Sequence, residues 1–152
     1  MRVLVENEAG SRTKHLYDEN MFKLKSVRTV QRPYPFPYGF IIGTRSGDGM
    51  CLDCFLLTRN PLKSGEIVDA EPIGAFEQIE DGQEDHNILA IPIGDNFEIT
   101  AALQDELTDF VLNVFADLPG KHIAVGRFLG RDEAVLLIEQ SRAWAGAIGI
   151  IR

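Results

Sequence analysis

The sequence predicts an α+β fold, in which a small β-barrel or β-sandwich comes first and two helices follow. Short strand-like runs fill the first two thirds of the chain, and Gly, Pro, Asn and Asp residues separate them. Beyond residue 100 the apolar residues recur at steps of three and four, the period of an amphipathic helix. Many short strands with such punctuation favour a barrel or sandwich. No linker, repeat or low-complexity segment interrupts the chain, so we expect residues 1–152 to form one domain.

The expected strands share a high content of apolar, β-branched and aromatic residues. They cover residues 2–5, roughly 22–30, 40–42, 51–57, 67–76, 88–93 and 121–128. Clusters of turn-forming residues lie between them, for example Asn60-Pro61 and the acidic turn Glu80-Asp81-Gly82.

Two helices are expected beyond residue 100, with the strand at 121–128 between them. The first has an apolar face that includes Leu103, Leu107 and Phe110, with Thr100 as its N-cap and Pro119-Gly120 as its end. The second helix follows Gly130 and continues to about residue 145.

Composition and charge exclude several classes of partner. With 45% hydrophobic and 25% charged residues the chain is typical of a globular protein. A formal net charge of -8 argues against binding to nucleic acid or to an anionic membrane surface, because both require a basic field. No apolar run has the length of a membrane span or of the core of a signal peptide, so we expect a cytoplasmic protein.

Cys51 and Cys54 have the C-x-x-C spacing that is found in zinc and redox sites. However, they fall within an expected strand, where residues three apart point to opposite faces. The chain has no second C-x-x-C pair to complete a tetrahedral site. We therefore interpret both thiols as small buried hydrophobic residues.

Carboxylates gather at two places in the sequence. Asp48 and Asp53 flank the start of one expected strand, and Glu80, Asp81 and Asp85 belong to one acidic turn. Mg²⁺ prefers oxygen ligands and is usually bound by one or two carboxylates together with water and substrate phosphate. Solvated turns have the same composition, so the residues by themselves give only a weak indication of a metal site.

Several spaced motifs in a fixed order give this pattern a family resemblance. They are Glu6 with Lys14 eight residues later, Tyr34-Pro35-x-x-Tyr38-Gly39-Phe40, Asp48 with Asp53, Asn60 to Gly65, and Ile79 to Asp85 before an apolar strand. In this order they resemble the soluble (family I) inorganic pyrophosphatases over about residues 6–128.

The resemblance implies a fold and a set of site residues. The fold would be an OB-like five-stranded β-barrel with two helices packed against its outside. Asp48, Asp53, Asp85 and Glu80 would bind Mg²⁺, and Lys14 and Tyr38, with Tyr34 beside them, would bind phosphate. Related bacterial enzymes form trimers or hexamers, so the resemblance also implies a homo-oligomer.

The chain departs from the family pattern inside the same motifs. Met50 stands where the family has the central aspartate that helps to make the attacking water. By the same alignment the family's glutamate, arginine, lysine and Tyr-Lys pair are replaced by Leu16, Ser26, Asn87 and Phe115-Ala116. Lys25 and Arg28 are candidates to replace the arginine.

Two further side chains lie next to these motifs. His86 follows the acidic turn, and Arg45 precedes the Asp48 loop. We interpret both as solvated surface residues, and a ligand role for His86 or a phosphate-binding role for Arg45 is the alternative.

The predicted function is therefore a divergent, Mg²⁺-dependent inorganic pyrophosphatase that converts diphosphate and water into two phosphates. A thioether at position 50 neither accepts a proton nor binds Mg²⁺ usefully, so no catalytic base is assigned and slow turnover is expected. One alternative is an inactive protein of this fold that binds a phosphate ligand, a metal or a protein partner. The other is a phosphohydrolase for another small phosphate compound.

Overall fold

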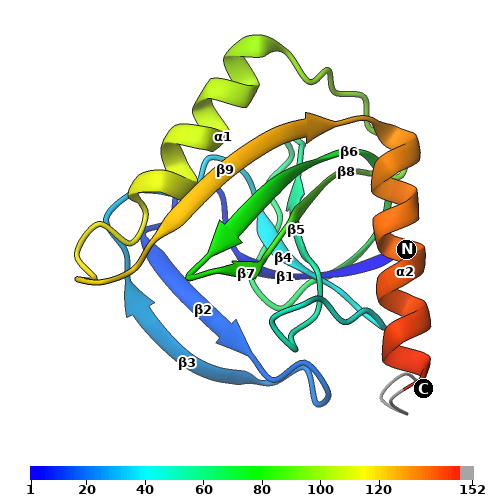
Figure 1. Cartoon of the computed structure of the whole chain (residues 1–152), viewed down its shortest axis with the longest axis horizontal. Coiled ribbons are helices and arrows are strands. Elements are labelled where there is room, and N and C mark those ends of the chain that lie inside the picture. The colour runs from blue at the N-terminus through cyan, green and yellow to red at the C-terminus, as the bar shows by residue number, and fades with distance from the viewer. Residues whose placement is uncertain (148–152) are drawn as a thin grey trace.

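Five strands pair edge to edge in a closed ring in the computed structural model, which describes residues 1–147 (Figure 1). The ring runs from β1 (Arg2–Asn7) to β4 (Tyr38–Ile41), β5 (Asp53–Leu56), β8 (Asn87–Pro92) and β6 (Ile67–Glu80), which pairs again with β1. All pairs are antiparallel except β5 with β8. The expected five-stranded barrel is confirmed.

Four further strands extend or flank the barrel. β7 (Gln83–Glu84) and β9 (Ile123–Leu129) both pair with β6. β2 (Thr13–Tyr17) and β3 (Leu24–Thr29) form a separate two-stranded hairpin that projects from one side of the barrel (Figure 1).

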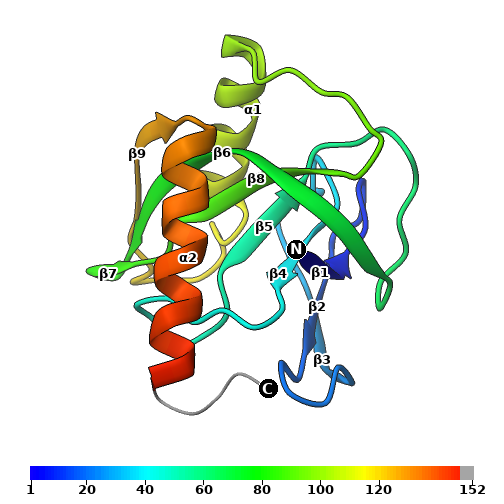
Figure 2. The same ribbon diagram turned by 90° about the vertical axis from the view of Figure 1, so that its right-hand side faces the viewer.

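Two helices pack on different sides of the barrel, as Figures 1 and 2 show. α1 (Ala101–Asn113) begins as predicted at Thr100, whose side chain accepts a hydrogen bond from the backbone N–H of Leu103. α2 (Arg131–Ala147) packs along β6. No helix within residues 1–147 is long and apolar enough to cross a membrane.

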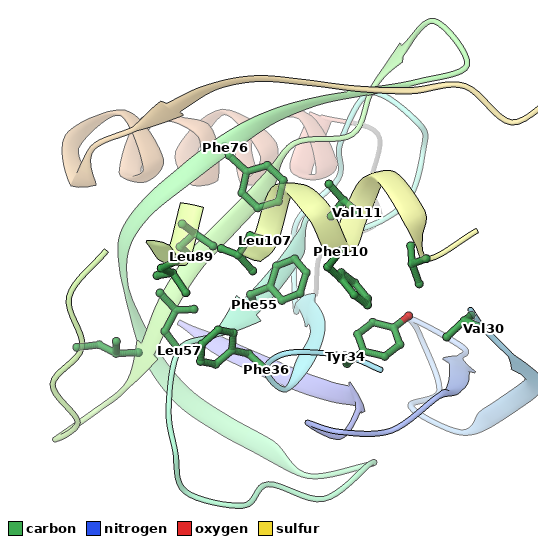
Figure 3. Packing of buried hydrophobic residues seen from close by; sticks show 13 residues of the cluster. Val30, Tyr34, Phe36, Phe55, Leu57, Phe76, Leu89, Leu107, Phe110 and Val111 are labelled. Atoms are coloured by element: carbon green, nitrogen blue, oxygen red, sulfur yellow. The ribbon is translucent and has the colours of Figure 1, made fainter. Parts of the chain in front are cut away.

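Alternation along the strands divides the core into two main clusters. One takes residues from all five barrel strands, including Cys54 and Leu56, and also Ala134 and Ile138 of α2. The other contains Phe55 and lies between the outer face of β5, β6 and β8 and the apolar face of α1 (Figure 3). Burial of each large side chain contributes roughly 1.5–3 kcal/mol. Along β5, Cys54 and Leu56 pack in the barrel interior, whereas Phe55 between them packs against α1.

The cysteine interpretation is also confirmed. Both thiols are free and buried, and Cys51 packs with Leu4 and Phe40 in a third cluster, apart from Cys54.

Two expectations about element boundaries were wrong. The run predicted at 22–30 starts at Leu24 and pairs with β2, which the sequence did not indicate because its residues are only partly buried or exposed. α1 ends at Asn113 rather than just before Pro119, and a series of turns follows it.

Gly39 is required by the barrel closure. It pairs with Val5 on β1, and a Cβ atom there would lie only 1.8 Å from the backbone oxygen of Leu4. We expect Gly39→Ala to lower the free energy of unfolding by about 3 kcal/mol or more, because backbone atoms cannot move aside cheaply. Urea denaturation followed by circular dichroism measures this change.

Gly130→Ala is the matched control, because a Cβ there has no neighbour within 4 Å. It should cost no more than about 1 kcal/mol, because Gly130 stands just before α2, where alanine is a poorer cap than glycine. Equal effects of the two substitutions would contradict the proposed packing.

Candidate functional site

A cleft of about 190 Å³ lies on the outer face of the barrel and reaches α1 and the β2–β3 hairpin. Met50 lines this cleft. So do all the site residues predicted from the sequence, which are Lys14, Tyr34, Tyr38, Asp48, Asp53, Glu80 and Asp85. The barrel thus brings together segments that are far apart in the chain.

Asp48 is held by a tight turn. Its Oδ1 atom accepts hydrogen bonds from Ser46 Oγ at 2.7 Å and from the backbone N–H of Met50 at 2.9 Å. The backbone N–H of Ser46 closes the turn on the carbonyl of Met50, and Gly49 supplies the positive φ of 84° that the turn needs. The Met50 side chain lines the cleft and is 41% exposed.

Asp53 and Asp85 approach the cleft from neighbouring parts of the barrel. Asp53 is the first residue of β5 and lies opposite Asn87 of β8 in the parallel register. Asp85 is buried just before β8, and its backbone N–H donates to the carbonyl of Gln78 on β6. Asn87 Nδ2 fixes this corner by donating to Gln78 Oε1 at 2.8 Å.

Burial and mutual repulsion keep these carboxylates from ionising easily. The pKa of Asp53 is raised well above its usual range, first by burial and then by the negative charge of Asp85. Burial also raises the pKa of Asp85, and the charges of Asp48 and Glu80 add to this effect. A divalent cation would remove this repulsion.

Glu6 adds a fifth carboxylate from β1. It is only 4% exposed, and its Oε2 accepts the backbone N–H of Tyr17 at 3.0 Å, which ties the hairpin to the barrel. Burial raises the pKa of Glu6 to about 7.

The cationic side of the cleft centres on Lys14. Its Nζ atom lies 5.7 Å from the ring centroids of both Tyr38 and Phe115. Tyr34 stacks on Tyr38 with a centroid distance of 5.5 Å. Burial raises the pKa of both phenols, so their hydroxyl groups stay protonated as hydrogen-bond donors at neutral pH.

The substituted positions divide into two groups. Leu16, Asn87 and Phe115 line the cleft, whereas Ala116 lines a neighbouring hollow. Ser26 is exposed and does not line the cleft.

Of the two candidate replacements for the arginine, Arg28 is placed nearer the site. It lies opposite Lys14 in the hairpin register, and its guanidinium carbon is 5.6 Å from the centroid of Phe115. Lys25 is exposed and its charge acts on Asp18 in the hairpin turn.

His86 and Arg45 support loops outside the cleft, and the interpretation of His86 as a solvated side chain is wrong. The His86 side chain is only 14% exposed, and its Nδ1 accepts the backbone N–H of Gln78 at 3.0 Å. The guanidinium of Arg45 donates to the carbonyl of Gly49 and so supports the Asp48 turn.

Two charged residues that line the cleft were missed in the sequence. Glu19 accepts the backbone N–H of Cys51 at 3.0 Å, and Lys121 pairs with Glu80 at 3.5 Å. Both stand in short segments outside the helices and strands, and no local pattern indicates that such segments fold over the cleft.

Comparison with known proteins decides the family. A family model described as inorganic pyrophosphatase matches residues 3–145. The inorganic pyrophosphatase of Halalkalibacterium halodurans is 31% identical, covering 92% of this chain and 91% of that protein. The chain belongs to the inorganic pyrophosphatase family.

Solved pyrophosphatase structures have the same fold. An inorganic pyrophosphatase from Neisseria gonorrhoeae superposes with a TM-score of 0.83 at 28% identity, covering 96% of this chain and 91% of that one. The enzyme from Thermus thermophilus gives a TM-score of 0.88 at 23% identity, covering 96% and 91%, and supports the fold alone.

The donor chemistry of this pyrophosphatase-family cleft suits a hard divalent cation. Its acidic side offers carboxylate oxygens, whereas structural zinc sites use Cys and His ligands. Within residues 1–147 no three His, Cys, Asp or Glu side chains are already gathered as a ligand set. Ion binding would therefore have to draw the carboxylates together and remove their protons.

Glu6 makes the metal-free protein sensitive to pH. Because its pKa is about 7 in the folded state against 4.5 as the ordinary value, its contribution to stability is present below pH 4.5 and is lost as the pH rises through 7. In EDTA we expect Glu6→Gln to remove up to about 3 kcal/mol of the stability difference between pH 4.5 and pH 8.

Urea denaturation of both proteins at the two pH values measures this difference. The glutamine keeps an acceptor for the Tyr17 N–H, so the hairpin contact is preserved. An unchanged pH dependence in Glu6→Gln would show that Glu6 is not the titrating group.

Proposed function

We propose that the protein hydrolyses inorganic pyrophosphate to two phosphates and that it uses Mg²⁺. The observation that carries the proposal is one cleft with a carboxylate side and a lysine–tyrosine side, matched to a metal ion and to a phosphate anion. Asp48, Asp53, Asp85 and Glu80 would bind Mg²⁺, and Lys14, Tyr38 and Tyr34 would bind phosphate. The names of the relatives support the same activity.

Each side of the cleft has a distinct role. When bound, Mg²⁺ neutralises phosphate charge and lowers the pKa of bound water. Lys14 supplies a charged donor to phosphate oxygen, and Tyr38 supplies a neutral hydroxyl donor beside it. The turn that holds Asp48 and the strand that starts at Asp53 place two carboxylates at the cleft before substrate arrives, so ion binding has only to draw their side chains together.

Met50 limits the rate in this proposal. Its thioether lines the cleft but accepts no proton, so the chain lacks a carboxylate at this point to orient and deprotonate water. Loss of such a group costs about 10²–10⁴-fold in rate. We therefore expect a slow pyrophosphatase.

The first test is the substitution Asp53→Asn, which keeps the size of the side chain but removes its charge. Phosphate release from pyrophosphate with Mg²⁺ should fall by at least about 100-fold, because a central metal ligand is lost. A colorimetric phosphate assay at several Mg²⁺ concentrations measures the effect.

Asp69→Asn is the matched control, because Asp69 is an exposed carboxylate of β6 that does not line the cleft. It should keep wild-type activity. If the wild type hydrolyses pyrophosphate and Asp53→Asn leaves the rate unchanged, the metal site is refuted. If the wild type does not hydrolyse pyrophosphate, the activity is refuted.

Met50→Asp tests why turnover is slow. The new carboxylate would stand in the exposed part of the cleft beside Asp48, so it should raise kcat for pyrophosphate by about tenfold or more. Met50→Asn is the control for size and polarity, and it should give no comparable gain. If the aspartate and asparagine variants have equal rates, Met50 does not limit catalysis.

A further inference from the structure

Three cationic groups from separate segments surround the ring of Phe115. Lys14 Nζ on β2 lies 5.7 Å from the ring centroid, and Arg28 Cζ on β3 lies 5.6 Å from it. Lys121 Nζ, from the segment between α1 and β9, is closest at 4.6 Å. Like charges repel one another, and the face of one ring offsets only part of that repulsion. An anion that entered the cleft would reduce this repulsion further.

Lys121 occupies a different place from Arg28 in this cluster. Lys121 lines the cleft, whereas Arg28 does not line it and pairs with Asp117 at 3.3 Å, where both side chains are more than one third exposed. The Lys121 side chain is only 24% exposed, so its charge is less screened by water. Lys14 and Lys121 are therefore the cations that an anion in the cleft would meet.

The partner of Lys121 connects the two sides of the cleft. Its Nζ atom lies 3.5 Å from Glu80 Oε2, and Glu80 is one of the carboxylates assigned above to Mg²⁺. One contact thus occupies a potential metal ligand and a potential phosphate ligand at the same time. A metal–diphosphate complex would offer each of them a better partner, since Glu80 could bind the ion and Lys121 could bind a phosphate oxygen.

Open space beside Lys121 allows this exchange. Lys121, Phe115 and Ile123 border both the cleft and a second hollow of about 280 Å³. Ala116 contributes only a methyl group to the lining of that hollow, which leaves space on this side of Lys121.

We infer that Lys121 is a phosphate-binding residue that is released from Glu80 when a magnesium–diphosphate complex enters the cleft. The inference rests on the proposed function and deepens it. Lys121 binds the diphosphate together with Lys14, while Glu80 becomes available to the metal.

The test is calorimetric titration of imidodiphosphate, a diphosphate in which NH replaces the bridging oxygen, in the presence of Mg²⁺. Lys121→Met should weaken its binding by about tenfold or more, and Lys121→Arg should stay within about threefold of wild type. Lys23→Met removes an exposed lysine that does not line the cleft and should have no effect.

Titration of Mg²⁺ alone separates this role from a structural one. Lys121→Met frees Glu80, so its affinity for Mg²⁺ without diphosphate should be equal to or higher than that of wild type. Imidodiphosphate binding within threefold of wild type would overturn the inference, and so would a parallel loss of Mg²⁺ affinity.

The outcome also distinguishes the inference from the proposed function. If the wild type binds imidodiphosphate through Lys121 but releases no phosphate from pyrophosphate, the activity fails and the inference stands. If it hydrolyses pyrophosphate and Lys121→Met has no effect, only the inference fails. A wild type that neither binds nor hydrolyses overturns both.

Discussion

The site depends on the return of strand β6 to β1, which closes the barrel. β6 pairs with β1 at its start, with β8 along its middle, and with β7 and β9 toward its end. Its register shifts between Pro72 and Gly74, where proline lacks an N–H and a Cβ on Gly74 would lie 2.9 Å from the carbonyl of Leu129. This bulge lets one strand close the ring and also carry Glu80 to the cleft that Glu6 enters from β1.

The sequence predicts the parts of this fold in which burial follows a period. The side chains of β5 and one face of α1 pack into the core clusters, so their apolar residues recur with the period of a strand or a helix and can be recognised in the sequence. β2 has no such periodic pattern, because it pairs only with β3 and is held by single contacts such as that of Tyr17 with Glu6. For the site, the carboxylates alone give only a weak indication, and the order of several spaced motifs, among them Asp48 with Asp53, is what indicates the cleft residues. Lys121 is missed because its position depends on how a turn after α1 folds back.

The departures from the family pattern that the sequence resembles imply that charge is redistributed in this cleft. By the family pattern Leu16 and Met50 each remove a carboxylate, and other substitutions remove cations from the opposite side. Glu19 and Lys121 return one charge of each sign from segments outside the motifs, and both line the cleft. We infer that the cleft keeps an acidic and a basic side although individual positions have changed.

Binding of a divalent cation to the acidic side of the cleft would displace protons from its buried carboxylates, so proton release is a direct measure of such binding. Burial raises the pKa of Asp53, Asp85 and Glu6, and carboxylates must be ionised to bind a metal. Calorimetric titration of Mg²⁺ into the metal-free protein at pH 7, in two buffers that differ in ionisation enthalpy, measures both binding and protons released. We expect saturable binding with net release of protons into the buffer. Absence of saturable binding, or binding without proton release, would contradict it.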